Sequence, residues 1–264
     1  MSVLVGVPIK NAAIWLPRFL EQLDKLSDVS RVVFICGPCR DDTYPQLWRW
    51  GNDTRHPVEI FDEPTGMNAL SAAQIGAVYK DFQDLMREDE DETHFLLIDS
   101  DIMDVPPDLI QLLKRQDKDI VAPYVWVDRA NPPQFFDVDC FRLNGFRFHP
   151  FLPPDPGKSL MVDSVGSCYL AKREPFLACE YGNPHPHMIF CGHAIEAGYE
   201  VWADPRIKIQ HLDSRRVGVV KTPLEILQGK PHNPPPFIKK DGSVVTNEEF
   251  VKELINVYVW GRVE

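Results

Sequence analysis

The feature that most constrains the fold is an alternation of short apolar runs with helical segments in the first half of the chain. A helix is predicted from about Asn11, a long helix covers Met67 to about Arg87, and another begins at Pro106. Strands that alternate with helices form a largely parallel sheet through right-handed crossovers, which predicts an α/β fold. The predicted strands are 2–7, 31–36, 57–61, 95–98 and 119–126.

The second half of the chain is organised differently. Residues 131–156 are rich in Pro and Phe, which is typical of a functional loop region. The proline-rich stretch 231–236 indicates a stiff linker. The remaining predicted elements are a strand at 164–172, a helix at 187–197 that ends at Gly198, strands at 200–203 and 207–212, and a final helix from the capping box 246–249 to about Tyr258.

Size and composition bound the class of protein. A chain of 264 residues can bury one good core, and no apolar run approaches the ~20 residues that span a bilayer. The first strand begins at Ser2, which leaves no room for a signal peptide, and the six cysteines lack the dense spacing of a disulfide framework. We therefore expect a soluble, cytoplasmic protein with reduced thiols.

The charge is negative overall but unevenly spread. A net charge of −11 argues against a generic binder of polyanions. Residues 206–240 nevertheless contain eight Lys and Arg side chains and two carboxylates, a net charge of +6. This basic segment is either a solvated surface or a cover over an anionic ligand, and the sequence leaves both interpretations open.

The strand at 95–98 ends in two acids one residue apart, Asp99 and Asp101. In open α/β sheets, ligands bind in the crevice outside the carboxyl ends of the strands. Residues two apart in an extended segment point the same way, so both carboxylates can face one hard cation. A cation held by so few carboxylates keeps positions for phosphate oxygens, which suits an enzyme of metal-bound nucleoside diphosphates.

Cys36-Gly-Pro-Cys39 follows the second predicted strand and matches a thioredoxin-type redox motif. That fold also needs a proline loop about forty residues farther on, and no proline occurs between Pro64 and Pro106. We therefore interpret the motif as a turn that leaves Asp41 and Asp42 available to a bound nucleoside.

The acids and histidines also allow two other interpretations, a phosphatase and a zinc site. A phosphatase of the haloacid dehalogenase type carries its acid pair on the first strand, followed by Thr or Val, whereas Met103 stands at that place here. His185, His187 and His193 lack the spacing of a closed zinc site. His211 follows an apolar strand and could complete a mixed nitrogen and oxygen site with the two acids.

Taken together, the chain resembles the GT-A glycosyltransferases of the family 2-like superfamily, and in pattern the fungal mannan-polymerase-type mannosyltransferases. The resemblance covers about residues 2–213 and implies a single GT-A domain at 1–213 with a mostly parallel central sheet. Residues 214–264 would then form a basic, proline-rich extension that could act as an active-site lid. The stretches that carry the resemblance are 2–10, 97–102, 107–111, 117–126, 163–172 and 197–212.

The resemblance also implies roles for individual residues. Asp101 and His211 would ligate Mn²⁺ or Mg²⁺, with Asp99 contacting the metal or the ribose. The turn at 163–167 would border the transferred sugar and the acceptor. The other residues expected to contact the nucleotide or the sugars are Pro8, Lys10, Asp41, Asp42, Asn68, Ser100, Trp126, Gly166, Ser167, Arg215 and Lys221.

The chain departs from the family in two ways. Inverting family 2 enzymes carry a Glu-Asp pair before the last helix of the domain, where this chain has Pro186-His187-Met188. Either His187 acts as the base or the enzyme retains configuration, and we favour retention. Asp163 and His187 are the candidate catalytic residues. The fungal enzymes are also membrane-anchored, so we expect a different acceptor here, a glycan, a small molecule or a modified nucleic acid.

The sequence therefore predicts a metal-dependent hexosyltransferase that uses a nucleoside-diphosphate sugar, GDP-mannose or a UDP-hexose. One alternative is a nucleotide-sugar-binding protein without catalysis, because a decayed transferase would also lack the Glu-Asp pair. The other is the phosphatase with an aspartate nucleophile.

Overall fold

The computed structural model describes residues 2–62, 72–127, 134–135, 141–143, 146–148, 157–182, 185–212, 237–238 and 244–245. Several predictions fall on other residues and lie outside this described part of the chain. They concern Asn68, the basic residues Arg215 and Lys221, the proline-rich stretch 231–236 and the helix after the capping box 246–249.

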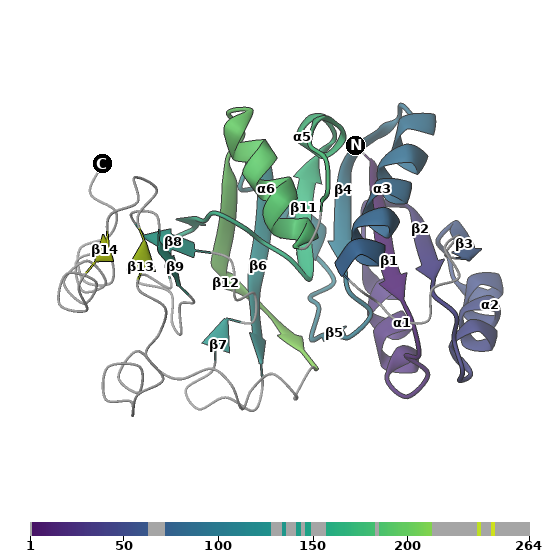
Figure 1. The fold of residues 1–264 in the computed structure, drawn as a ribbon. Helices are drawn as coiled ribbons and strands as arrows, with labels where there is room; N and C mark the ends of the chain where they lie inside the picture. The colour runs from purple at the N-terminus through teal and green to yellow at the C-terminus, as the bar shows by residue number, and fades with distance from the viewer. Residues whose placement is uncertain are drawn as a thin grey trace, which may run out of the picture.

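A ten-stranded sheet runs through the molecule in the order β10-β12-β6-β11-β4-β1-β2-β3, with β5 paired to β12 and β7 to β6 (Figure 1). The four strands β4, β1, β2 and β3 are parallel, and so are β6 and β12. Only short edge pairings and β11 are antiparallel, which confirms the predicted mostly parallel α/β sheet. The bounds are β1 (Ser2–Ile9), β2 (Val29–Cys36), β3 (Val58–Asp62), β4 (Glu92–Ile98), β5 (Ile102–Met103), β6 (Ile120–Val127), β7 (Gln134–Phe135), β10 (Leu160–Met161), β11 (Cys168–Lys172) and β12 (Val201–His211).

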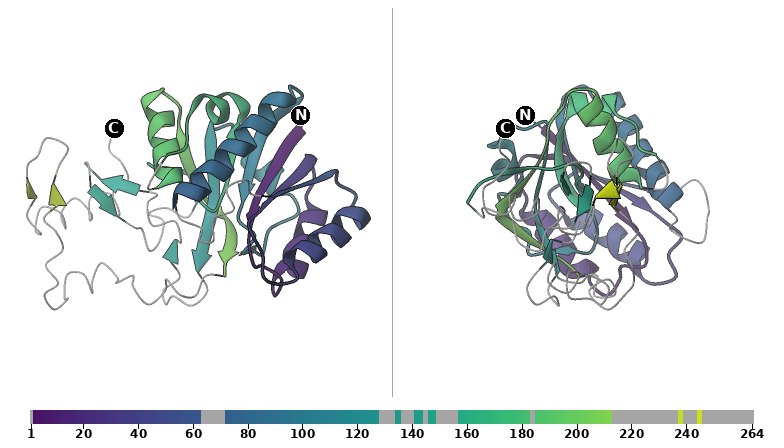
Figure 2. Two further views of the ribbon diagram at one scale, coloured as in Figure 1. Left: turned by 45° about the vertical axis from the view of Figure 1, so that its right-hand side comes forward. Right: turned by 60° about the vertical axis from the view of Figure 1, so that its left-hand side comes forward.

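Helices cover both faces of this sheet (Figure 2). The chain moves from β1 to β2 to β3 in one direction and then returns past β1 to β4. Right-handed crossovers therefore place α1 and α2 on one face and α3 on the other, where α3 contacts α5 and α6. The helices are α1 (Leu16–Lys25), α2 (Thr43–Asp53), α3 (Ala72–Glu88), α4 (Leu109–Lys114), α5 (Arg173–Ala178) and α6 (Pro186–Glu196).

Two short hairpins lie outside the main sheet. β8 (Phe141–Leu143) pairs with β9 (Phe146–Phe148), and β13 (Phe237–Ile238) pairs with β14 (Val244–Val245). The first falls in the region predicted to be an irregular functional loop.

The first helix begins later than predicted. Asn11 has a left-handed backbone with φ of 50°, so it cannot start a helix, and α1 begins at Leu16 with Pro17 in its first turn. Its apolar face then packs into the core through Leu16, Phe19, Leu20 and Leu23. The sequence did not predict α2 or α5, because the helical pattern of apolar residues in these segments extends over too few residues to be recognised.

The two strands predicted at 200–203 and 207–212 form one strand, β12. Its register on β6 shifts between Asp204 and Lys208, so Pro205 to Ile207 bulge from the ladder. Arg206 fixes the bulge, because its guanidinium donates to both carboxylate oxygens of the buried Asp204 at 2.8 and 2.7 Å.

Close packing at the centre of the sheet explains one glycine. A Cβ atom built on Gly6 in β1 would lie 2.5 Å from the ring of Phe95 on β4. Phe95 stacks on Phe176 of α5 with 3.9 Å between ring centroids, so the ring has no room to withdraw. Only glycine lets β1 and β4 pair at this level.

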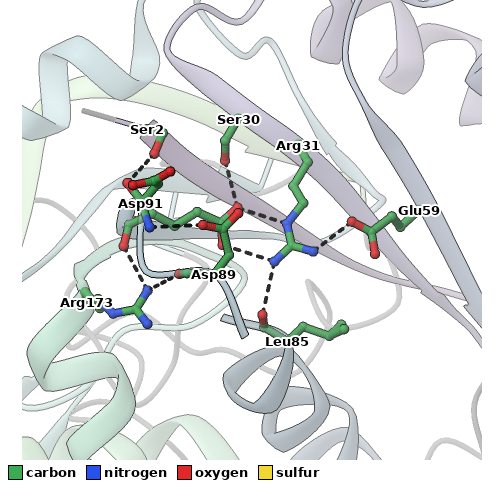
Figure 3. A network of polar contacts seen from close by, with 9 residues as sticks. Ser2, Ser30, Arg31, Glu59, Leu85, Asp89, Asp91 and Arg173 are labelled. Carbon is green, nitrogen blue, oxygen red and sulfur yellow. Dashed lines mark hydrogen bonds and ion pairs between the residues drawn. The ribbon is translucent and has the colours of Figure 1, made fainter. Parts of the chain in front are cut away.

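The amino end of the sheet contains a buried ion pair (Figure 3). A run of acidic residues such as 88–92 is ordinarily solvated, but Glu92 is fully buried at the start of β4. Arg31 of β2 binds it in bidentate geometry, with Nε–Oε1 at 2.9 Å and a second contact at 3.1 Å. Ser30 donates to the same carboxylate at 2.8 Å. Hydrogen bonding to Glu92 raises the pKa of Arg31 above its usual range.

The same guanidinium closes the network around it. Arg31 also binds Glu59 at 2.7 Å and donates to the Leu85 carbonyl at the end of α3 at 3.1 Å. Arg173 of α5 donates to the carbonyls of Asp89 and Glu92 at 2.6 and 3.0 Å. The turn between α3 and β4 is thereby tied to β2 and to α5.

We predict that Glu92→Gln destabilises the fold by about 3–5 kcal/mol, because it removes the buried charge that binds the Arg31 guanidinium in bidentate geometry and leaves only the partly exposed Glu59 as a charged partner. Glu59→Gln is the matched control: it removes the other carboxylate from the same arginine, but Glu59 is 38% exposed and water can replace it. Its expected cost is below about 1 kcal/mol. Urea unfolding of the two variants measures the difference, and equal costs would contradict this account.

Candidate metal centre

The two predicted acids lie where β4 ends at the carboxyl edge of the sheet. The Asp99 N–H donates to the Ser167 carbonyl at 2.8 Å, and the Ile102 N–H donates to the Asp99 carbonyl at 3.1 Å. These bonds fold residues 99–101 into a tight turn between β4 and β5. Ser100 is buried within this turn.

His211 reaches the same turn because β5 pairs antiparallel with the end of β12. His211 is the Cα partner of Ile102, and Gln210 is the partner of Met103. The Leu212 N–H also donates to the Asp101 carbonyl at 3.1 Å. In Figure 1 this junction lies at the lower edge of the sheet, where the arrow of β12 points toward β5.

The three side chains converge as the sequence predicted. One ligand atom each from Asp99, Asp101 and His211 lies within 4.8 Å of the others, and His211 Nε2 is 3.4 Å from an Asp101 oxygen. The His211 side chain is 6% exposed and that of Asp101 30%, so the cluster opens to solvent on the side of the acids. Two carboxylates and one imidazole form a donor set that suits Mn²⁺ or Mg²⁺.

The segment 163–167 forms the wall beside Asp99. Ser167 has a left-handed backbone with φ of 49°, which turns its carbonyl toward the Asp99 N–H before β11 begins. The Val165 N–H donates to the buried Cys191 sulfur of α6 at 3.5 Å. Gly166 and Ser167 therefore lie beside the acids, and Asp163 and the buried Ser164 precede them in the same segment.

Trp126 lies next to the end of β12. It pairs with Gln210 on one side and with Phe135 of β7 on the other, and it is partly buried. The register places it one residue from His211 along the neighbouring strand. Its contact with the transferred sugar or the acceptor stays a prediction.

A second corner of the carboxyl edge joins the loop after β1 to the loop after β2. Asp41 accepts hydrogen bonds from the Ala13 N–H at 3.1 Å and from the Thr43 hydroxyl at 2.6 Å. The Thr43 hydroxyl in turn accepts from the Ala12 N–H at 2.7 Å. Burial opposes ionisation of Asp41, but these hydrogen bonds outweigh it and lower the pKa of Asp41.

The predicted nucleoside residues therefore differ in role. Asp41 ties the two loops together, whereas Asp42 is exposed and makes no capping bond to α2. Lys10 lays its aliphatic chain across Gly37, where a Cβ would lie 3.2 Å from Lys10 Cδ. Pro8 is partly buried within β1, opposite Ile35. We call these two loops, residues 10–15 and 37–42, the loop corner.

His187, the candidate base, sits in an aromatic cluster at the start of α6. Its Nε2 is 3.0 Å from the Tyr79 hydroxyl, and its ring packs on Tyr79 with 4.7 Å between centroids. Tyr181 and Tyr169 complete the cluster and hydrogen-bond to each other. Burial lowers the pKa of His187 to about 4, so the ring is neutral at pH 7.

Sequence reasoning missed the partner of His187 and the connectors of the loop corner. Tyr79 lies on the predicted long helix, where an aromatic residue is ordinarily interpreted as part of the apolar face that packs on the core. Thr43 and Asn11 carry no motif of their own. Only the contacts across the fold identify these residues as part of the site.

The fold is shared with solved structures at low sequence identity. S. aureus TarS 1-349 in complex with UDP-GlcNAc matches with a TM-score of 0.51 and 11% identity, over 84% of this chain and 62% of that one. GalNAc-T7 with UDP, GalNAc and Mn²⁺ matches with a TM-score of 0.57 and 10% identity, over 80% of this chain and 44% of that one. These likenesses establish the GT-A fold.

The chain spans between 36% and 65% of the length of the similar structures. No protein-family model matches the sequence, and no curated protein matches it either. Within the described ranges, none of the helices is both long and apolar enough to cross a membrane.

The lowered pKa of His187 predicts a pH-dependent stability. The pKa of His187 is near 6.5 in the unfolded chain and about 4 in the native state. Between these two values the unfolded chain binds a proton at this residue and the native state does not, so stability falls as the pH falls. Lowering the pH from 7 to 5 should therefore cost on the order of 1–2 kcal/mol at this residue. His94, whose pKa burial also lowers to about 4, acts in the same direction.

Urea unfolding at pH 7 and pH 5 tests this, comparing the parent with His187→Gln. The variant should lose less stability on acidification than the parent, whatever its stability at pH 7. An identical loss in both proteins would show that His187 is not kept neutral by the fold.

Proposed function

We propose that this chain is a metal-dependent glycosyltransferase that moves a hexose from a nucleoside-diphosphate sugar, GDP-mannose or a UDP-hexose, to an acceptor. The observation that carries the proposal is the convergence of Asp99, Asp101 and His211 at the carboxyl edge of a GT-A fold. Support also comes from similar structures that hold UDP-GlcNAc, or UDP, GalNAc and Mn²⁺.

Asp101 and His211 would hold Mn²⁺ or Mg²⁺, with Asp99 as a third ligand or a ribose contact. When bound, the cation supplies Lewis-acid stabilisation of the charge that develops on the leaving diphosphate. The partial exposure of Asp101 leaves room on that side for phosphate oxygens. Ser100, buried in the turn between the two acids, would contact the nucleotide.

The loop corner would receive the nucleoside. Asp42 is exposed there for hydrogen bonds to ribose or base, and Lys10 is available to a phosphate. Asp41 would act mainly by holding the two loops in register through Ala13 and Thr43. Asn68, Arg215 and Lys221 would complete the donor site, the last two from a basic lid within the extension 214–264.

The transferred sugar and the acceptor would lie between Trp126 and the 163–167 turn. We propose that the reaction proceeds with retention, in which the leaving diphosphate receives the acceptor proton. Two features support this: residues 186–188 offer no carboxylate, and His187 is both hydrogen-bonded to Tyr79 and lowered in pKa. A base of so low a pKa accepts a proton weakly at neutral pH.

The missing carboxylate also favours a second candidate, a nucleotide-sugar-binding protein that does not turn its ligand over. Release of labelled sugar from the donor distinguishes the two. The aspartate-nucleophile phosphatase gains no support from the fold comparisons, and a covalent aspartyl-phosphate would be its signature.

We predict that UDP or GDP sugars raise the melting temperature only when Mn²⁺ is present. A donor at 100 times its dissociation constant adds about 2.7 kcal/mol of stability. Asp101→Asn should abolish the metal-dependent shift. Asp104→Asn is the matched control, because Asp104 lies in the same segment, is half exposed in a surface ion pair with Arg18, and has a left-handed backbone that Asn tolerates. A normal shift in Asp101→Asn would refute the metal assignment.

We predict that the hexose in the product keeps the donor's anomeric configuration. Proton NMR of the earliest product, with a simple alcohol or water as acceptor, reports the anomer before it equilibrates. His187→Ala should then lower turnover through loss of packing with Tyr79, by less than the ~100-fold that removal of a general base costs. An inverted product together with a loss of 100-fold or more would identify His187 as the base.

A further inference from the structure

The Cys36-Gly-Pro-Cys39 turn holds two thiols close together at the loop corner. The two Sγ atoms are 3.6 Å apart, and both point at the Gly37 carbonyl, at 3.5 and 3.2 Å. Of the five cysteines in the described part of the chain, Cys39 alone is not buried. The pair therefore combines one accessible thiol with one enclosed thiol within reach of it.

The backbone at Cys36 is held by the sheet, whereas the backbone at Cys39 is not. Cys36 is the last residue of β2 and pairs with Ile9 on one side and Asp62 on the other, so the sheet fixes it. Cys39 lies in the following loop, outside any strand or helix. Closing the gap of 3.6 Å to a disulfide bond of about 2 Å therefore requires Cys39 to move.

Cys39 is also a contact point between the two loops. Its sulfur accepts a hydrogen bond from the Asn11 N–H at 3.4 Å, and the Asn11 side chain accepts one from the Arg40 N–H at 2.8 Å. Lys10 packs on Gly37 within the same turn. A movement of Cys39 toward Cys36 would break the bond to Asn11 and displace Lys10 and Arg40 with it.

We propose that Cys36 and Cys39 are a reversible thiol-oxidation site that sets the arrangement of the loop corner. Hydrogen peroxide oxidises the Cys39 thiol to a sulfenic acid and is reduced to water. The Cys36 sulfur then attacks the Cys39 sulfur, so that an S–S bond forms, the S–O bond breaks, and a second water leaves with the Cys36 proton. A small dithiol returns two electrons and two protons and restores both thiols.

The order of these steps follows from the surroundings of each thiol. Burial, and then the neighbouring Cys39, raise the pKa of the Cys36 thiol, so it stays protonated at neutral pH and reacts second. Its proximity to Cys39 compensates for its weak ionisation, because the attack is intramolecular.

The consequence for ligand binding rests on the function proposed above. If the loop corner holds the nucleoside, oxidation weakens nucleotide affinity, by about 5–150-fold for a coupling of the usual size. By linkage, saturating nucleotide must shift the dithiol–disulfide equilibrium toward the thiols by the same factor. The oxidation itself does not depend on what the loop corner binds.

The first experiment follows the bond directly. The full chain is treated with peroxide, remaining thiols are alkylated, and trypsin releases residues 32–40, which contain Cys36 and Cys39 and no other cysteine. We expect this peptide to lose two hydrogens in mass and to escape alkylation until a dithiol is added. Recovery of the fully alkylated peptide after oxidation would overturn the proposal.

The second experiment follows the loop corner without any ligand. Amide exchange in residues 8–16 should become faster on oxidation, because the Asn11 N–H loses its acceptor. Cys36→Ala and Cys39→Ser should abolish this response, and Cys179→Ala, a buried thiol on the connection after α5, should keep it. Unchanged exchange in a protein whose disulfide has formed would overturn the coupling.

The third experiment measures UDP and GDP affinity with Mn²⁺ by calorimetry, before and after oxidation. Weaker binding by the oxidised protein supports the coupling, and equal binding overturns the nucleotide consequence. If neither nucleotide binds the reduced protein, the proposed function fails, whereas the peptide mass and amide exchange still decide the oxidation site.

Discussion

The antiparallel strand β11 is the element on which the arrangement of the site depends. It pairs with both β4 and β6, so its first residue lies at the carboxyl end of β4. The turn at 163–167 is thereby held against Asp99, whose N–H donates to the Ser167 carbonyl. β11 and β6 separate β4 from β12 in the strand order, and the pairing of β5 with the end of β12 brings Asp101 to His211.

The two ends of the sheet carry opposite electrostatic arrangements. At the amino end, Glu92 is enclosed with Arg31, and its carboxylate is satisfied from several sides. At the carboxyl end, Asp99 and Asp101 lie close together beside an imidazole, where like charges repel. The satisfied ion pair at the amino end can stabilise the fold, while the two neighbouring carboxylates at the carboxyl end reduce its stability unless a cation binds. Native proteins commonly tolerate such a cost at functional sites.

The features of the fold and the site that could be predicted from the sequence were those that depend on local patterns. Contacts between residues distant in sequence could not be predicted from such patterns. The strands followed from local apolar runs, and the placement of Asp99 and Asp101 followed from the rule that ligands bind outside the carboxyl ends of the strands. The convergence of His211 with these two acids was implied by the resemblance to GT-A glycosyltransferases. The burial of Glu92 could not be predicted, because an acidic run is ordinarily solvated and its partner Arg31 is distant in sequence. The Tyr79–His187 contact likewise joins helices that share no local pattern. The predicted start of α1 was wrong, because Asn11 has a left-handed backbone and the helix begins only at Leu16.

The bulge in β12 has a consequence for how this centre can change over evolution. Three residues, Pro205 to Ile207, stand in β12 without partners on β6. Side chains alternate between the two faces of a strand, so an odd number of extra residues exchanges the faces beyond the bulge. Lengthening or shortening the bulge by one residue would turn the His211 imidazole away from Asp101 without altering any ligand. The geometry of the candidate metal centre therefore depends on the length of this bulge, and a single insertion or deletion there would separate the three side chains while all three residues remain in the sequence.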